Sequence, residues 1–195
     1  MDFLVAFIPL FPFIAAAIIG FSNLFNRIDG VQSERITAVI AKSAITLSCL
    51  LAILLLVADL MTKNVGTYVV GQWLGSGNLV VELNFISSGF SVIVAALFSV
   101  ILVIITRFSM NYIHSEAGFH RFYFILSLFS SAMLLLILSG NATGTFIGWE
   151  IAGLCSYLLI SFAYNSPVAT INATWVFVTN RIGDAGFILG IALSF

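Results

Sequence analysis

The sequence predicts an all-α polytopic membrane protein with about six transmembrane helices. Apolar residues make up 61% of the 195-residue chain, charged residues make up 8%, and the mean hydropathy is +1.16. Soluble domains carry about 25% charged residues and about 45–50% apolar residues, so a soluble core could not hide this much apolar surface. The apolar residues also fall into runs of about 20, the length that crosses a bilayer. We therefore expect residues 1–195 to form a single membrane domain.

The apolar runs set the expected spans. The first run lacks a basic segment and a small-residue cleavage site, so we expect a retained span rather than a signal peptide. Pro9 and Pro12 are expected to kink or loosen its first half. The predicted spans are 3–21, 36–60, 89–106, 122–138, 144–163 and 168–195.

Residues 62–88 differ from the rest of the chain. β-Branched and aromatic residues dominate 67–74 and 79–85, and Gly75-Ser-Gly-Asn78 separates the two runs. The second run alternates apolar with polar residues, which is typical of a strand with one buried face. This pattern predicts a short β-hairpin outside the hydrocarbon, between the second and third helices.

The basic residues predict an orientation. Arg27 and Arg35 lie in the first predicted loop, Arg107 and Arg121 lie in the third, and the second loop holds only Lys63. Loops rich in Lys and Arg stay on the cytoplasmic side, or its matrix equivalent. The first and third loops are therefore expected inside, with the N-terminus and the hairpin facing outward.

One carboxylate, Glu150, lies within the fifth apolar run, about six residues or ~9 Å from the run's outer end. A charge at such a depth costs about 2.5–3.5 kcal/mol on insertion scales, and intramembrane acids are therefore rare and functional. A cation, a water path or a substrate is expected to face it. The alternative is a protonated carboxyl group that rests against a backbone carbonyl and has no role in transport.

The sixth run contains Asn180-Arg-Ile-Gly-Asp184, in which Arg181 and Asp184 are three residues apart and share one face of a helix. Asp184 lies about ten residues or ~15 Å from the outer end of this run, so it can sit at a depth comparable to that of Glu150. We expect the three ionisable groups to form a constellation for proton movement or charge coupling. A self-neutralised pair that only fixes helix packing is the alternative for Arg181 and Asp184.

Other polar or reactive groups give weaker signals. Lys42, about 9 Å inside the second span, can snorkel to the headgroups or act as a buried functional lysine. His114 is a possible secondary proton site, although it and His120 fit loop-ordering histidines. Cys49 and Cys155 are expected to be buried hydrophobes. We expect no catalytic nucleophile, no metal site and no bound cofactor, and no basic patch indicates nucleic acid.

Small residues recur at intervals of four and predict close helix contacts. Gly140, Gly144 and Gly148 cross into the fifth span, and Gly186 and Gly190 repeat the spacing in the sixth. Such spacing lets two helix backbones approach closely.

The segments Trp149-Glu-Ile-Ala-Gly-Leu-Cys-Ser-Tyr-Leu-Leu-Ile160 and Asn180-Arg-Ile-Gly-Asp184 resemble the antiporter-like, proton-translocating subunit of respiratory complex I. That family comprises bacterial subunit L and mitochondrial NADH dehydrogenase subunit 5. The third loop resembles the family's YM…E…G…RFF element, through Tyr112, Glu116, Gly118, Arg121 and Phe122, with Ile113 in place of the methionine. The hairpin also has a counterpart in that family.

The resemblance implies a proton-translocating subunit of a NADH–quinone oxidoreductase. It implies that Glu150 pairs with a lysine of a seventh helix, and that Arg181 and Asp184 form the charged pair of the sixth. Redox chemistry would belong to partner subunits, and another membrane subunit or a later segment would supply the channel lysines. The implied location is the bacterial inner membrane or the mitochondrial inner membrane.

The residues and the resemblance give three hypotheses on the function of the chain. The first is a complex I-type subunit that contributes part of a proton path. The second is a membrane subunit of a cation/proton antiporter, or of a proton-driven bicarbonate uptake complex. The third is a non-conducting structural half-subunit, favoured because the sequence supplies no lysine for Glu150. We expect a fragment, a split gene product or a reduced relative that does not conduct protons alone.

Overall fold

A computed structural model describes residues 2–25, 31–62, 66–76, 79–114, 116 and 118–194. Over these residues a short 3-10 helix, η1 (Asp2–Ala6), precedes α1 (Phe7–Leu24), α2 (Val31–Thr62), α3 (Phe90–Tyr112), α4 (Phe119–Leu138), α5 (Ala142–Ile160) and α6 (Pro167–Ser194). The strands β1 (Thr67–Ser76) and β2 (Leu79–Ile86) lie between α2 and α3. Each of the six α-helices is long and apolar enough to cross a membrane. The predicted fold class, a multi-span α-helical membrane protein with a hairpin between helices two and three, is confirmed.

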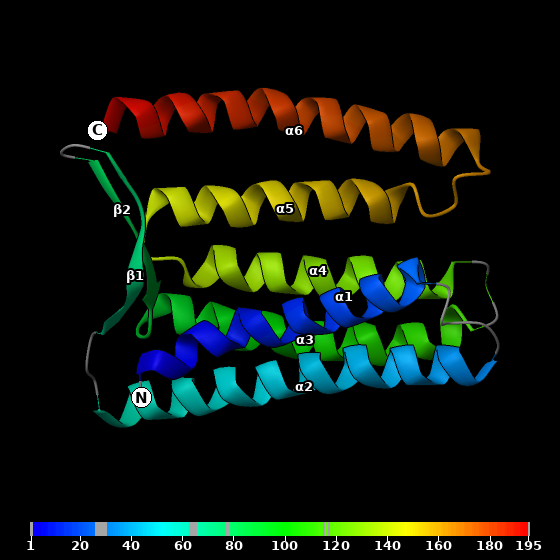
Figure 1. Ribbon diagram of the computed structural model, residues 1–195, viewed down its shortest axis with the longest axis horizontal. Helices are drawn as coiled ribbons and strands as arrows, with labels where there is room; N and C mark the ends of the chain where they lie inside the picture. The colour runs from blue at the N-terminus through cyan, green and yellow to red at the C-terminus, as the bar shows by residue number, and fades with distance from the viewer. Residues whose placement is uncertain are drawn as a thin grey trace.

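The helices lie side by side with their long axes roughly parallel (Figure 1). Helices α1 to α4 pack together, α5 packs on α4, and α6 packs on α5 at the edge of the bundle. The hairpin lies at the end of the bundle where α1 and α5 begin. Because α6 has one neighbouring helix in the described chain, most of its surface is exposed, including Trp175 and Ile182.

Several helices extend beyond the predicted spans. α2 begins at Val31 rather than 36, α3 ends at Tyr112 rather than 106, and α4 begins at Phe119 rather than 122. Hydropathy marks only the apolar middle of a span, whereas a helix continues through polar residues that keep its backbone hydrogen bonds. Arg35, Arg107 and Arg121, which the hydropathy pattern places in loops, therefore lie within α2, α3 and α4, close to the helix ends.

The fifth helix begins and ends earlier than its predicted span. It runs over Ala142–Ile160 rather than 144–163, and Asn141 caps its first turn by accepting a hydrogen bond from the Gly144 amide at 2.7 Å. Arg27 and Lys63, which enter the predicted orientation, lie outside the described residues. Residues 77–78 of the predicted hairpin turn lie outside them as well.

Helix α1 is helical through both of its prolines. Pro12 has no N–H for the Ile8 carbonyl, and the Ser48 hydroxyl of α2 donates to that oxygen at 2.5 Å instead. The Ser131 hydroxyl of α4 donates to the Pro9 carbonyl at 2.8 Å. Ser48 thus satisfies the carbonyl that Pro12 leaves without a helix partner, as a bilayer interior requires, and Ser131 adds a second contact to the same segment.

The backbones of α4 and α5 meet at Gly148. A Cβ at this position would lie 2.7 Å from the Leu136 nitrogen and 2.9 Å from the Ala132 oxygen, both backbone atoms of α4. In contrast, a Cβ at Gly186 or Gly190 would meet no described atom within 4 Å. Gly148 therefore lies at the close helix contact that the glycine spacing predicts for α5. Gly186 and Gly190 of α6 make no such contact with the described residues.

Gly148→Ala is expected to destabilise the α4–α5 contact by about 1–3 kcal/mol, because a backbone cannot move aside as a flexible side chain can. Gly186→Ala is the matched control, with open space at its Cβ. The apparent melting temperature of the purified protein in detergent measures the difference. An equal effect of the two substitutions would contradict this packing.

The hairpin is attached to the turn that begins α5. Strands β1 and β2 pair antiparallel from Thr67↔Ile86 onward, with two register shifts along the ladder. The Gly140 amide donates to the Asn84 carbonyl at 2.9 Å, and the Asn141 side-chain amide donates to the Glu82 carbonyl. The hairpin therefore helps to fix where α5 starts, and with it the height of Glu150 in the bundle.

Candidate functional site

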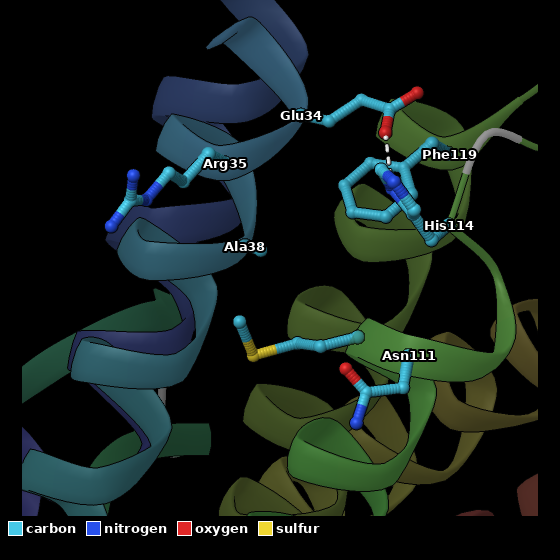
Figure 2. Close-up of a pocket in the computed structure, with 7 residues that line it drawn as sticks. Glu34, Arg35, Ala38, Asn111, His114 and Phe119 are labelled. Atoms are coloured by element: carbon cyan, nitrogen blue, oxygen red, sulfur yellow. Dashed lines mark hydrogen bonds and ion pairs between the residues drawn. The ribbon is translucent and has the colours of Figure 1, made fainter. Parts of the chain in front are cut away.

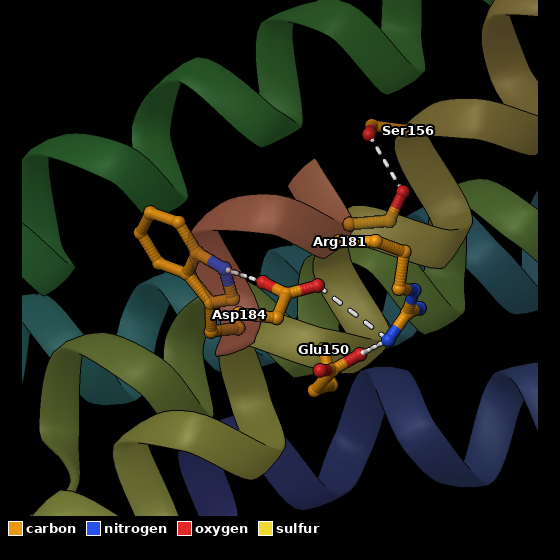
Figure 3. A network of polar contacts seen from close by, with 6 residues as sticks. Glu150, Ser156, Arg181 and Asp184 are labelled. Atoms are coloured by element: carbon orange, nitrogen blue, oxygen red, sulfur yellow. Dashed lines mark hydrogen bonds and ion pairs between the residues drawn. The ribbon is translucent and has the colours of Figure 1, made fainter. Parts of the chain in front are cut away.

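Glu150, Arg181 and Asp184 meet between α5 and α6 (Figure 3). Arg181 Nη1 donates to Glu150 Oε2 and lies 3.5 Å from Asp184 Oδ2. The guanidinium thus stands between two carboxylates, one on each helix. The spacing of Arg181 and Asp184 predicts their pairing, but the sequence does not identify the partner of Glu150. In the described chain that partner is Arg181.

The three groups differ in exposure. The Asp184 side chain is 6% exposed, Glu150 is 22% exposed, and Arg181 is 44% exposed at the open face of α6. The Arg181 guanidinium also lies over the Phe177 ring, 4.8 Å from its centroid. A cation over an aromatic face gains about 0.5–2 kcal/mol, depending on its desolvation. The ring therefore helps to hold the arginine against the two carboxylates.

Trp149 belongs to the same cluster, although no charge or spacing in the sequence predicts it as a site residue. Its indole Nε1 donates to Asp184 Oδ1 at 2.8 Å, across the contact between α5 and α6. The available signal was the indole N–H beside an intramembrane acid, because a donor in an apolar setting needs an acceptor. The sequence could not show that the acceptor is Asp184 rather than a backbone carbonyl.

The cluster carries an unbalanced charge. Two carboxylates face one guanidinium, so the ionised cluster has a net charge of −1, and in the described chain Arg181 makes the ion pairs to both acids. Charges separated by about 4 Å interact by about 4 kcal/mol at the effective dielectric near a protein surface. The arrangement can therefore accept one further positive charge, either a proton on a carboxylate or a cation from another segment.

A hollow lies beside the cluster between α4, α5 and α6. It has a volume of about 290 Å³, and Trp149, Ser156 and Asn180 give it polar groups among apolar ones. One water molecule occupies about 30 Å³ in the liquid, so the hollow has room for several. Water there would reach the indole and the turn of α6 that precedes Arg181.

The secondary candidates, Lys42 and His114, lie apart from this cluster. Lys42 is half-buried in α2, where its carbonyl accepts from Thr46 at 2.7 Å. His114 Nδ1 lies 3.1 Å from Glu34 Oε2, joining the α3–α4 connection to the start of α2. The structure therefore brings together Glu150, Arg181 and Asp184, and it does not bring Lys42 or His114 to them.

A second hollow lies around the His114–Glu34 contact, with a volume of about 430 Å³ (Figure 2). Glu34 and His114 point toward each other there, whereas Arg35 points away from them on α2. His120 Nδ1, at the start of α4, lies 2.9 Å from the Thr37 hydroxyl of α2. His114 thus joins the α3–α4 connection to α2, and His120 joins the first turn of α4 to α2.

Two family models match separate parts of the chain. Residues 73–123 match the "NADH-Ubiquinone oxidoreductase (complex I), chain 5 N-terminus", and residues 139–195 match the "NADH:quinone oxidoreductase/Mrp antiporter, TM". The second segment contains the whole charge cluster.

Curated relatives cover nearly the whole chain. The NAD(P)H-quinone oxidoreductase subunit 5 of the Anthoceros angustus chloroplast is 32% identical over 94% of this chain and 25% of its own length. The subunit 5 of the Paulinella chromatophora chromatophore is 34% identical over 96% of this chain and 28% of its own length. The corresponding chain 5 of Picosynechococcus is 31% identical, again over 94% of this chain and 27% of the relative. The chain thus spans about a quarter of the length of these relatives.

A solved structure shares the fold. The membrane-bound sulfane sulfur reductase, described as an archaeal respiratory membrane complex, contains a chain that superposes with a TM-score of 0.81. The superposition covers 97% of this chain and 36% of that chain, at 17% sequence identity. This likeness concerns the fold, whereas the two family models and the curated relatives show that the chain belongs to the family of subunit 5 of complex I-type NAD(P)H–quinone oxidoreductases.

Proposed function

We propose that the chain contributes part of a proton path to a complex I-type NADH–quinone oxidoreductase. The observation that carries this proposal is the cluster of Glu150, Arg181 and Asp184, three ionisable groups joined across two apolar helices. Such groups in a membrane span mark ion paths or proton relays. The relatives named as NAD(P)H-quinone oxidoreductase subunits support the assignment to an oxidoreductase.

The proposed mechanism uses the unbalanced charge of the cluster. An arriving proton or cation neutralises the excess negative charge, and the Arg181 guanidinium then redistributes between the two carboxylates. Because the guanidinium lies within reach of both carboxylates, we propose a second arrangement in which it pairs more closely with Asp184, and a change at either end would favour one arrangement over the other. Glu150 and Asp184 would hold the moving charge, and Arg181 would couple them.

The chain would work with partner membrane subunits. We propose that redox chemistry belongs to those subunits and that a cation for Glu150 comes from one of them or from a further segment. We propose that the chain lies in a bacterial inner membrane, a mitochondrial inner membrane or a photosynthetic membrane. The photosynthetic membrane is included because the relatives include chloroplastic and cyanobacterial proteins.

The hairpin is proposed to face outward, away from the side of the arginine-rich helix ends. Arg35, Arg107 and Arg121 lie toward the opposite end of the bundle from the hairpin, and basic residues favour the inner side. In Ser76→Cys and Glu116→Cys variants, an impermeant thiol reagent added outside should label position 76 alone. The native Cys49 and Cys155 are buried, so the unsubstituted protein gives the background. Labelling of position 76 only from inside would reverse the orientation.

The identity of the complex is tested by purification from the native membrane through an affinity tag on this chain. We expect NADH-oxidising and quinone-binding subunits in the isolated complex, and proton uptake coupled to quinone reduction in vesicles. The Mrp antiporters named by the second family model supply the competing candidate. Antiporter subunits, or a zinc-containing soluble protein of a bicarbonate uptake complex, in place of redox subunits would overturn the proposal.

A further inference from the structure

We propose that Trp149 is a positioning residue that decides how Arg181 is shared between Glu150 and Asp184. The inference rests on the proposed function and extends it to a residue that carries no charge. Its basis is one hydrogen bond across α5 and α6, from the indole Nε1 to Asp184 Oδ1 at 2.8 Å.

The two oxygens of Asp184 have different partners. Oδ1 accepts from the indole, and Oδ2 faces the guanidinium at 3.5 Å, while Arg181 is in direct hydrogen-bond contact with Glu150. A carboxylate as buried as Asp184 requires donors, because an unpaired charge away from water is costly. The indole N–H supplies one of them. Asp184 therefore draws less strongly on Arg181, and the guanidinium stays on Glu150.

The indole is held in place by stacked rings from both helices. Its plane lies 7° from that of Phe187, with 6.3 Å between centroids, and Phe187 stacks on Phe146 at 5.5 Å. Phe187 is three residues beyond Asp184 on α6, so one helical turn carries both the acceptor and the ring that orients the donor. Trp149 also lines the hollow of about 290 Å³. The indole thus connects that hollow to the charge cluster.

Removal of the indole N–H alone has a defined consequence. Among the residues that the structure describes, the guanidinium is then the donor left within reach of Asp184, and Arg181 moves toward Asp184 and away from Glu150. A hydrogen bond to a charged group is strong enough to change such an equilibrium about tenfold or more. The fraction of Glu150 paired with Arg181 should fall accordingly, and proton uptake should fall with it.

The test replaces Trp149 with β-(3-benzothienyl)alanine, in which sulfur stands in place of the indole N–H and the ring stays nearly the same size. Trp149→Phe is the second variant. Both are made in the full-length subunit within its native membrane complex. The same replacement at Trp175, which is exposed on α6, is the matched control. Proton uptake in vesicles and the melting temperature of the purified complex are measured for each variant, alone and combined with Asp184→Asn.

We expect the analogue at position 149 to lower proton uptake about tenfold and to lower the melting temperature. The fall in melting temperature should not add to that of Asp184→Asn, because the acceptor charge is already lost in that variant. Normal uptake by the Trp149 variants, when Glu150→Gln and Asp184→Asn both fail to pump, would overturn the positioning role alone. Normal uptake by all of these variants would overturn the proposed function as well. Additive losses of melting temperature in the combined variant would show a packing role and would also overturn the inference.

Discussion

Glu150→Gln is expected to reduce proton uptake by the assembled complex about tenfold or more while the subunit content stays normal. Glutamine keeps the shape of the side chain and an oxygen that accepts from Arg181 Nη1. It removes the excess negative charge of the cluster, which is the feature that lets the site receive a further proton or cation. A Coulomb term of about 4 kcal/mol for a partly screened pair exceeds the 1.4 kcal/mol that corresponds to tenfold in rate.

Two further variants separate charge from size. Glu150→Asp keeps the charge on a shorter side chain and should retain part of the uptake. Glu116→Gln removes a carboxylate from the α3–α4 connection and should pump normally. Proton uptake is measured in vesicles that contain the intact complex, with the redox rate recorded in parallel. If Glu150→Gln pumps at the full rate with normal subunit content, Glu150 is a structural residue and the charge cluster loses its proposed role.

The fold was predictable because two sequence patterns depend on the surroundings of each residue. Long apolar runs mark residues in the bilayer, and apolar–polar alternation marks a strand with one buried face. The six spans and the hairpin follow from these patterns, and the structure confirms both. The ends of helices were less predictable. Arg35 and Arg107 look like loop residues in a hydropathy pattern, yet the helices continue through them, since a helix end depends on capping and on its backbone hydrogen bonds.

The candidate site was predictable in its members but not in its connections. Charged residues within apolar runs are rare enough to identify Glu150, Arg181 and Asp184 from the sequence. The i, i+3 spacing predicts only contacts within α6. The contact from Arg181 to Glu150 depends on the rotation of α5 against α6, which the packing of whole helices sets. Trp149 was missed for the same reason, since its acceptor is 35 residues away in the sequence.

Arg181→Leu is expected to impair assembly more than any single change at the two acids. It leaves both Glu150 and Asp184 without the cation that now serves them, and Asp184 is almost fully buried. Loss of one partner from a fully buried ion pair costs about 3–5 kcal/mol. The cost here should lie toward the lower end, because Arg181 is 44% exposed and water screens part of the interaction.

Because Arg181 contacts two carboxylates, one further substitution should not fully restore the assembly that Arg181→Leu impairs. If Arg181 paired with Asp184 alone, the double change Arg181→Leu/Asp184→Asn would restore assembly. Because Arg181 also serves Glu150, that double variant still strands one carboxylate and should recover only in part. Addition of Glu150→Gln removes the last unpaired charge, so the triple variant should assemble better than Arg181→Leu alone. The amount of subunit in the purified complex measures each step. Full recovery in the double variant would show that the Arg181–Glu150 contact contributes nothing to assembly.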